Sequence, residues 1–398
     1  MKKHMILAAV AALTLASCAK IDTFETKPVV DENVPIAFTN YTPKSLTKAD
    51  QANYVDGTTL INNATFAVYG WSVANTTYAA GVGDKTFYAD ASGAPNFMNP
   101  AVVTYAGDTN TGEGNTYSPT RYWPSGDVPA GLSFFAYYPE NAGTITPTVS
   151  KTAGTNPASA VSFATFSFTA EAAAADMVDF LVSDVASNQY YGYTNYSGKA
   201  QSVKFSFHHQ LTKVAVKFKT DNTDAKTVVT VTSAQFKNIH NTGTLTAKIN
   251  GTTTTTEWGS VSGTATYEVF VPNSGVLTTT AEPATIDNAT NDDVIFLMVP
   301  QDMIESNGTD PQYLEIIWTV ETYEETAHTH LTSTTTNTKK LYLDECVTSD
   351  SGTTQANIDW AMNNNIVYTI TVGPKPIWFT AEVGAWDDPV TNGYFSAQ

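Results

Sequence analysis

The sequence is poor in cysteine and in basic residues. Only two of its 398 residues are cysteines, Cys18 and Cys346, so a framework of disulfide bonds cannot hold the fold together. Lysine and arginine total 20, against 38 aspartate and glutamate residues, which gives a formal net charge of −18. An acidic excess of this size repels a phosphate backbone, so we set nucleic acid aside as a class of partner.

Long apolar runs are also scarce. One apolar and small-residue run, residues 5–17, follows Lys2 and Lys3 at the N-terminus. It is shorter than the roughly 20 residues that a membrane-spanning helix needs. A short apolar run behind basic residues is typical of a secretory signal peptide, so the sequence predicts export from the cytoplasm.

The end of this run carries a second signal. Leu15-Ala16-Ser17-Cys18 resembles the lipobox of bacterial lipoproteins. The resemblance implies that residues 1–17 are a signal peptide and that Cys18, carrying diacylglycerol, becomes the first residue of the mature chain. The alternative is an ordinary signal peptide followed by a chance cysteine, which the small residues before Cys18 make less favourable. The lipid would then be the membrane tether.

Aromatic residues and threonine are plentiful, whereas helical periodicity is rare. The chain has 20 tyrosines, 19 phenylalanines and seven tryptophans, and such side chains favour pleated, half-buried strands. Apolar residues alternate with polar ones at residues 34–38, 203–207, 214–218 and 314–320, which predicts strands with one buried face. Short strands between Gly-, Asn- and Thr-rich turns predict an all-β fold of two antiparallel β-sandwiches.

A Tyr-, Gly- and Asn-rich stretch at residues 190–199 divides the chain. We expect residues 18–48 to hold a tether and the first strand, residues 49–198 an N-terminal β-sandwich domain, and residues 199–398 a C-terminal one. Pro35 cannot donate to a strand ladder, so it places the first strand at a sheet edge, or itself lies at that strand's first residues.

Motifs for chemistry are absent from the sequence. It has no nucleophile elbow, HExxH motif, phosphate loop or paired CxxC, so we expect no enzyme, no cofactor and no metal site. His208 and His209 are adjacent on a strand and would face opposite sides, which makes them a poor chelate. His328 and His330 near residues 324–325 form a weak transition-metal pattern. Residues 108–113 offer oxygen ligands as calcium loops do, although a surface turn is favoured.

Two further patterns concern the surface. The Thr-rich runs at residues 252–256 and 332–338 indicate exposed loops or edge strands. The aromatic pairs Tyr122-Trp123 and Tyr190-Tyr191 are candidates for stacking on sugar rings, although packing in the core or between domains is favoured for them. They motivate one alternative function, a surface glycan-binding or tip-adhesin lipoprotein that does not polymerise.

Several short motifs follow one another in an order that resembles the fimbrillin family of Bacteroidales, the subunits of type V pili. They are residues 36–38 (IAF), 66–70 (FAVYG), 122–124 (YWP), 132–139 (LSFFAYYP), 207–214 (FHHQLTKV), 299–301 (VPQ) and 377–379 (IWF) with Trp386. The match spans nearly the whole mature chain. It implies two transthyretin-like β-sandwich domains in tandem and a structural role in surface adhesion, with other pilus subunits and a host glycan or protein as partners.

The resemblance also implies an assembly route. Fimbrillins reach the outer membrane as lipoproteins, and a surface protease cuts after a basic residue behind the first strand, which then leaves. In this chain the departing strand is residues 34–42, and the cut falls between Lys48 and Ala49, with Lys44 as second choice. An arginine-specific protease cannot make that cut, because Arg121, the one arginine, lies inside the first domain.

The physics of a departing strand supports this route. Inward-facing Val34, Ile36 and Phe38 would each contribute about 1.5–3 kcal/mol when buried. Their removal would leave an apolar groove with unpaired backbone groups, which templates another strand. A neighbour's strand in that groove links subunits head to tail into a filament. We expect the donor within residues 377–398. The candidate donor residues are Ile377, Phe379 and Val383.

Overall fold

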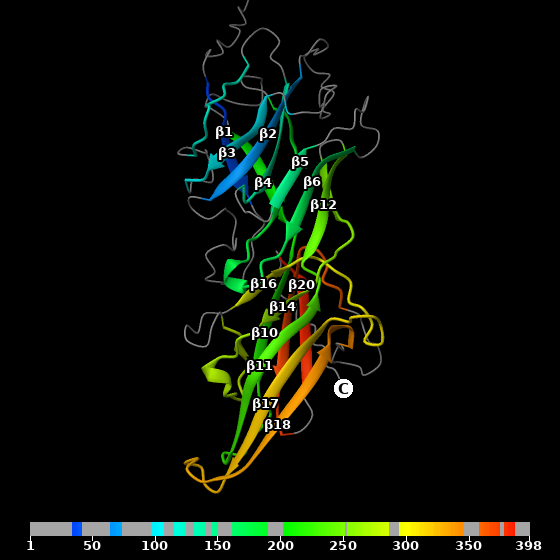
Figure 1. The fold of residues 1–398 in the computed structure, drawn as a ribbon. Helices are drawn as coiled ribbons and strands as arrows, with labels where there is room; N and C mark the ends of the chain where they lie inside the picture. Colours follow the sequence, from blue (N-terminus) through cyan, green and yellow to red (C-terminus); the bar gives the residue numbers. More distant parts are fainter. Residues whose placement is uncertain are drawn as a thin grey trace, which may run out of the picture.

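Strands make up almost all of the regular structure. The computed structural model describes residues 34–41, 64–73, 95, 97–106, 115–124, 131–140, 145–149, 161–189, 202–250, 253–285, 294–345, 358–374 and 378–386. The molecule is elongated, with the strands of the N-terminal part in the upper half of Figure 1 and β10, β11, β17, β18 and β20 in the lower half. In the described residues, no helix is long and apolar enough to cross a bilayer.

The elements follow in chain order. The first nine strands are β1 (Ala37–Tyr41), β2 (Thr65–Val73), β3 (Met98–Thr104), β4 (Gly131–Tyr138), β5 (Ile145–Val149), β6 (Val161–Thr169), β7 (Leu181–Ser183), β8 (Ala186–Gln189) and β9 (Ser202–His209). The others are β10 (Thr212–Lys219), β11 (Thr227–Ile239), β12 (Thr242–Asn250), β13 (Thr253–Trp258), β14 (Ala265–Glu268), β15 (Glu282–Pro283), β16 (Ile295–Met298), β17 (Tyr313–Tyr323), β18 (Leu331–Tyr342), β19 (Asn364–Thr371) and β20 (Trp378–Ala385). Short 3₁₀ turns are η1 (Ala174–Asp176), η2 (Asn273–Gly275) and η3 (Leu343–Glu345). The predicted all-β fold is confirmed.

Two sheets form the N-terminal part. One has the strand order β1-β9-β7-β4-β2-β3, with β8 also paired to β4, and the other has the order β13-β12-β6-β5. Strand β4 shows why they stack. Phe134 points to one face of the first sheet, where it belongs to one hydrophobic cluster. Its neighbour Phe135 points to the other face and packs against Phe166 of β6. Because successive side chains point to opposite faces, a strand covered on both sides is apolar throughout, as the LSFFAYY run is.

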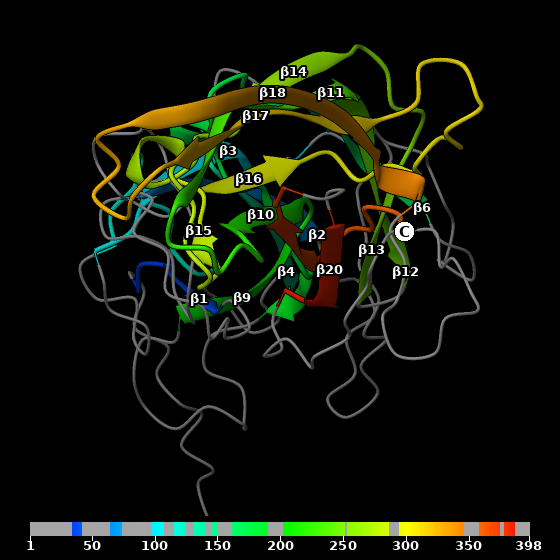
Figure 2. The same cartoon turned by 90° about the horizontal axis from the view of Figure 1, so that it is seen from below.

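Two more sheets form the C-terminal part. Their orders are β15-β10-β19-β20, with β16 also on β10, and β14-β11-β17-β18. Figure 2 shows the second sheet arching over the first. Between them lie large aromatic side chains, and Phe236 of β11 contacts the rings of Phe296, Trp360 and Tyr368 edge-on or tilted. One hydrophobic cluster contains these side chains and those packed between the two N-terminal sheets.

Most strand pairs are antiparallel, as predicted, and two of the described pairs are parallel, β1 with β9 and β10 with β19.

Hydrogen bonding between strands crosses the predicted domain boundary at residue 199. Strand β9 pairs with β1 and β7, and β12 pairs with β6, so strands that follow this boundary complete sheets that begin before it. The linker stretch itself, residues 190–199, lies outside the described residues.

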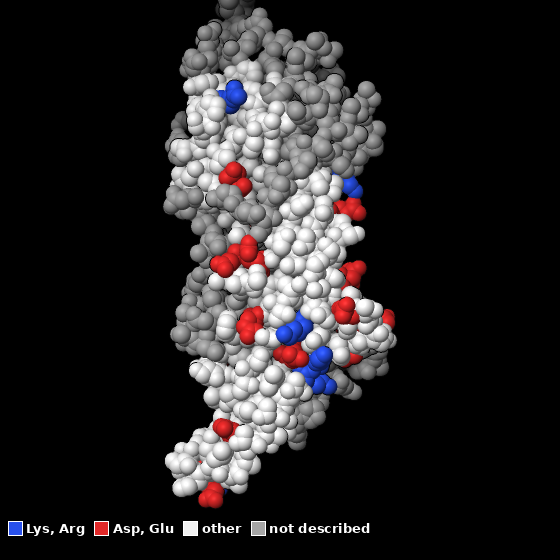
Figure 3. Space-filling view, in the orientation of Figure 1, with Lys and Arg blue, Asp and Glu red and all other residues white. Residues whose placement is uncertain are grey.

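The Thr-rich runs are edge strands, which confirms one of the two forms predicted for them. Residues 253–256 of the first run lie in β13 and the second run lies in β18, and each strand ends its sheet order. Nearly every residue of β18 is exposed, and it carries Lys339 and Lys340. Threonine and lysine at such an edge discourage uncontrolled pairing with other chains. Charged side chains on the face in Figure 3 are scattered singly or in small mixed groups.

Candidate functional site

The first strand fills a core of its own. Val34, Ile36 and Phe38 are only 9%, 2% and 1% exposed, and they belong to a cluster with residues from β2, β3, β4, β7 and β9. The Phe38 ring stacks on Phe205 at 5.7 Å between centroids and meets Phe134 edge-on at 5.5 Å. The alternation seen in the sequence therefore corresponds to real burial. Val34 and Ile36 lie just before β1, so the occupant is the segment of residues 34–41, and we call the cavity that holds it the β1 groove.

One wall of the β1 groove is β9. The two strands run parallel, in register from Ala37 opposite Ser202 to Tyr41 opposite Ser206. Pro35 precedes the first paired residue of this ladder, so its missing N–H costs no ladder bond there. Pro35 thus lies just before β1, and β1 itself ends the strand order of its sheet.

The other wall is the segment of residues 115–124, which we call the clasp. Pro35 and Tyr122 form an antiparallel bridge. In it the N–H of Ile36 donates to the Arg121 carbonyl at 2.9 Å, and the N–H of Trp123 donates to the Val34 carbonyl at 3.0 Å. β1 ends the strand order of its sheet, as expected, and the clasp covers this edge at residues 34–38. Its second edge is covered, because an irregular segment supplies the partners that another strand would otherwise supply.

Two side chains of the clasp also bind the backbone of β1. The Tyr117 hydroxyl donates to the Ile36 carbonyl at 2.8 Å, and the Asn115 amide Nδ2 donates to the Phe38 carbonyl, also at 2.8 Å. Burial raises the pKa of Tyr117 above its ordinary value, so the hydroxyl keeps the proton that it donates. Sequence reasoning missed both residues, because neither belongs to a periodic pattern.

The clasp is anchored on the far side by β3. Thr104 and Thr116 exchange two backbone hydrogen bonds, of 2.9 and 3.1 Å, and the N–H of Ala106 donates to Asn115 Oδ1 at 2.7 Å. Since β3 and β1 end the strand order of their sheet, the clasp joins the two ends. The clasp thereby links β3 to the segment of residues 34–38.

The aromatic residues proposed for sugar stacking behave differently from one another. Trp123 is 6% exposed and packs edge-on against Phe134 at 6.5 Å, so its ring is part of the core and presents no face to a sugar. Tyr122 is 48% exposed. Tyr190 and Tyr191 lie outside the described residues. The packing interpretation is therefore correct for Trp123.

The predicted donor region is described in part. Strand β20 pairs antiparallel with β19 along all eight of its residues and ends its sheet order. Ala381 is buried in the core, and Val383 is half-buried against it. Ile377 and the side chain of Phe379 lie outside the described residues. So do the predicted processing residues Lys44, Lys48 and Ala49, and the predicted lipid attachment residue Cys18.

A buried histidine connects β9 to the end of β20. His209 Nδ1 lies 3.1 Å from Asp179 Oδ2, with both side chains almost fully buried, and the Trp386 ring stacks on the imidazole at 4.1 Å. His208 points the other way, to the surface, where Nε2 lies 3.0 Å from Asp184 Oδ2. The two histidines therefore face opposite sides, as predicted, and each is paired with its own carboxylate.

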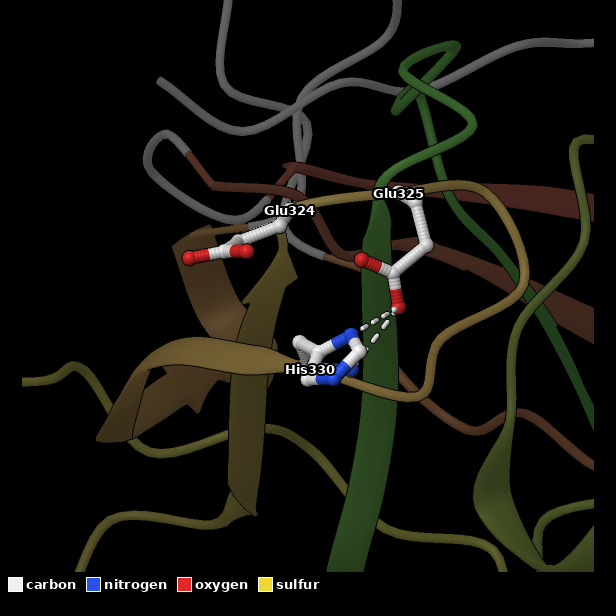
Figure 4. Close-up of side chains that lie close together, drawn as sticks. All are labelled: Glu324, Glu325 and His330. Atoms are coloured by element: carbon white, nitrogen blue, oxygen red, sulfur yellow. Dashed lines mark hydrogen bonds and ion pairs between the residues drawn. The ribbon is translucent and has the colours of Figure 1, made fainter.

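The carboxylates and histidines near residue 328 surround a surface turn. Figure 4 shows Glu324, Glu325 and His330, whose ligand atoms lie within 4.8 Å of one another. Glu325 Oε1 also accepts the N–H groups of Thr329 and His330. His328 does not join them, because its Nε2 bonds the Ala225 carbonyl at 2.9 Å. The group stabilises its own turn. The calcium-like pattern at 108–113 lies outside the described residues.

Comparison with known proteins adds two findings. A family model described as fimbrillin-like matches residues 47–386. The fold also resembles a solved fimbrial protein from Bacteroides vulgatus, with a TM-score of 0.55 and 17% identity, covering 88% of this chain and 99% of that one. At this identity the similarity establishes the fold alone.

Weaker structural similarities and the curated proteins complete the comparison. A candidate cell adhesion protein from Bacteroides uniformis has a TM-score of 0.41 and 14% identity, covering 89% of this chain and 100% of that one. Another from Bacteroides ovatus has a TM-score of 0.41 and 15% identity, covering 89% and 99%. We draw nothing further from these two. The comparison with curated proteins gives no match.

Proposed function

The chain belongs to the fimbrillin-like family, and from this premise we propose that it is a structural subunit of a type V pilus that serves surface adhesion. The subunits would join when β1 leaves one copy and a neighbour's strand takes its place. The observation that carries this proposal is the β1 groove, in which an early strand fills a core built by residues far along the chain. We assign the protein no catalytic role.

The contacts of residues 34–41 favour replacement of this segment by another strand over a groove that stays empty. Three buried side chains contribute about 1.5–3 kcal/mol each, and each backbone hydrogen bond contributes about 1 kcal/mol net. Without β1, Phe134 and Phe205 would face water, and both β9 and the clasp would present unpaired backbone groups. A second strand of similar pattern restores these terms, so an emptied groove strongly favours pairing with another subunit.

Processing would begin at the cell surface. In this proposal, Cys18 carries the lipid that holds the exported chain at the outer membrane, and a lysine-directed or broader protease then cuts between Lys48 and Ala49. The family match begins at residue 47, just behind β1, so the matched part of the chain is nearly the part that remains after this cut. The cut also separates the chain from Ala49 onward from the lipid on Cys18, which stays covalently joined to β1.

The incoming strand is proposed to come from residues 377–398 of a neighbour. Donation by Phe379 and Val383 requires β20 to leave the ladder that it forms with β19. Donation by residues after Trp386 leaves β20 in place, with the Trp386 ring still stacked on His209. The second arrangement costs less, because the ladder between β19 and β20 is kept.

N-terminal sequencing of protein sheared from the native cell surface tests the proposal. We expect a start at Ala49 in high-molecular-weight material that resists dissociation until it is heated in detergent. A chain that begins at lipidated Cys18 and remains monomeric would contradict the assembly route. Substituting Lys48→Gln should keep the chain unprocessed, whereas Lys44→Gln should not.

A further inference from the structure

We propose that a pocket between the clasp and the start of β3 binds a carboxylated sugar, whose carboxylate is held by the guanidinium of Arg121. The proposal rests on the adhesive role given above and supplies a ligand for it, but it does not depend on strand exchange. The uncut chain therefore tests it, and its failure would leave the assembly route standing.

The pocket has a volume of about 280 Å³, near the lower end of the range of about 300–1,000 Å³ for small-molecule sites. Such a volume suits one sugar ring or a group of similar size. Two segments line it. The main contributors are Phe97, Asn99 and Pro100 on one side and Ser118, Pro119 and Arg121 on the other.

The one arginine of the chain lines this pocket with an exposed side chain. The Arg121 Cζ lies 5.9 Å from the centroid of the Phe97 ring, and no carboxylate in the described part of the chain forms an ion pair with it. A guanidinium stays charged at physiological pH, and its paired N–H donors match the two oxygens of a carboxylate. In a chain with 38 acidic residues, this guanidinium is thus left to bind a carboxylate from outside.

The fold sets the positions of the Arg121 backbone and the Phe97 ring. The Arg121 carbonyl accepts the N–H of Ile36 at 2.9 Å, and Phe97 donates its own N–H to the Gly70 carbonyl at 3.0 Å. The Phe97 ring packs edge-on against Phe134 at 6.3 Å between centroids. Because these parts of the pocket are ordered before a ligand arrives, binding costs less conformational entropy.

The rest of the lining favours a sugar over a peptide strand. Asn99 and Ser118 are exposed polar residues at the pocket, and their side chains can both donate to and accept from hydroxyl groups. A peptide that adds to an edge needs backbone N–H groups to pair with, and Pro100 and Pro119 have none.

The net charge of the chain limits the number of carboxylates on the ligand. At −18 the protein repels a polyanion over a distance, whereas a single carboxylate pairs with Arg121 at short range. We therefore expect a neutral glycan that ends in one acidic sugar. A sialic acid and a uronic acid both have this chemistry, a carboxylate on a six-membered sugar ring.

The test titrates the uncut chain with 3′-sialyllactose, with the methyl ester of this sugar and with lactose, and measures binding by calorimetry. The ester has the shape of the acid without its charge. We expect the acid to bind at least about tenfold more tightly than either neutral sugar, because both lack the charge-assisted hydrogen bonds. A disaccharide that ends in glucuronic acid is compared with its own methyl ester in the same way, and the tighter-binding acid identifies the source.

Two variants then locate the site. Arg121→Gln removes the charge and should weaken binding of the acidic sugar at least about tenfold, and Asn99→Asp adds a carboxylate to the lining and should weaken it about three- to tenfold. The matched control is Lys340→Gln on β18. It removes a cation that also lies over an aromatic ring, 4.4 Å from the Tyr313 centroid, but outside the pocket, and it should leave binding unchanged.

The comparison of acid with ester needs no variant, so it decides the matter even if a substitution unfolds the chain. Equal binding of acid and ester, or no binding of either acidic sugar, would overturn the proposal. Binding of the acid that Arg121→Gln leaves intact, or that Lys340→Gln weakens as much, would overturn it too. None of these results bears on processing at Lys48, which tests the assembly route separately.

Discussion

Strands β1 and β18 both end the strand order of a sheet, yet their surroundings are opposite. β1 has five residues, and its Phe38, with Val34 and Ile36 just before the strand, belongs to a largely aromatic cluster. β18 has 12 residues, of which only Leu341 is buried. The clasp covers the second edge of residues 34–38, whereas none of the described residues forms a ladder with the second edge of β18.

The difference shows that a strand contributes to stability according to how much of its side chains and edges other residues cover. A short strand held between two walls stabilises the core of its sheet, and its removal opens that core to water. A long strand bonded on one side alone can be rich in threonine, because few of its side chains need an apolar neighbour. The chain therefore carries an edge protected from chance pairing at β18 and a groove suited to specific pairing at β1.

The largest effect is expected from Phe38→Ala. Phe38 is 1% exposed and contacts three aromatic rings, so its truncation leaves a cavity that the rigid sheet cannot collapse. We expect the free energy of unfolding to fall by about 3–5 kcal/mol, measured by chemical denaturation of the uncut chain. The control is Leu331→Ala at the start of β18, where the side chain is 53% exposed and the loss should be about 0.5 kcal/mol or less.

A smaller effect is expected from Tyr117→Phe in the uncut chain. The substitution removes the hydrogen bond to the Ile36 carbonyl and leaves the ring against Phe38. The free energy of unfolding should fall by about 0.5–1.5 kcal/mol. Tyr122→Phe, in the same segment but with an exposed side chain, should change it little. Equal effects from the two substitutions would mean that the clasp does not hold β1.

The smallest effect is expected on β18. Thr336 is exposed on this edge strand and lies opposite Thr319 of β17. Thr336→Ala should change the free energy of unfolding by no more than about 0.5 kcal/mol in either direction. A loss similar to that of Phe38→Ala would show that β18 is covered by a partner in solution, and the contrast between the two strands would fail.

Sequence patterns identified the local features of this contrast. The alternation at residues 34–38 predicted which side chains of β1 are buried, and the Thr-rich run at 332–338 predicted an exposed edge. Both depend on the period of side chains along one strand, which the sequence displays directly. The all-β fold follows from the same periodicity.

The walls of the groove could not be predicted in this way. Asn115 and Tyr117 lie 77 and 81 residues from the carbonyls that they bind, and Ser202 lies 163 residues from its β1 neighbour Thr39. The clasp has no regular period, and its Tyr122-Trp123-Pro124 motif was the one signal that this segment matters. Pro35 indicated an edge position, which the sheet order has, but a side chain or irregular segment that covers an edge leaves no pattern in the sequence.

The removable strand is tested most directly by cutting the full chain after Lys48. The mass of the cut protein is then measured as a function of concentration, and the released segment is identified by mass spectrometry. We expect the segment that contains residues 34–41 to dissociate as the remaining chains form oligomers that grow with concentration. A cut protein that loses this segment and yet stays monomeric and folded at high concentration would contradict the account.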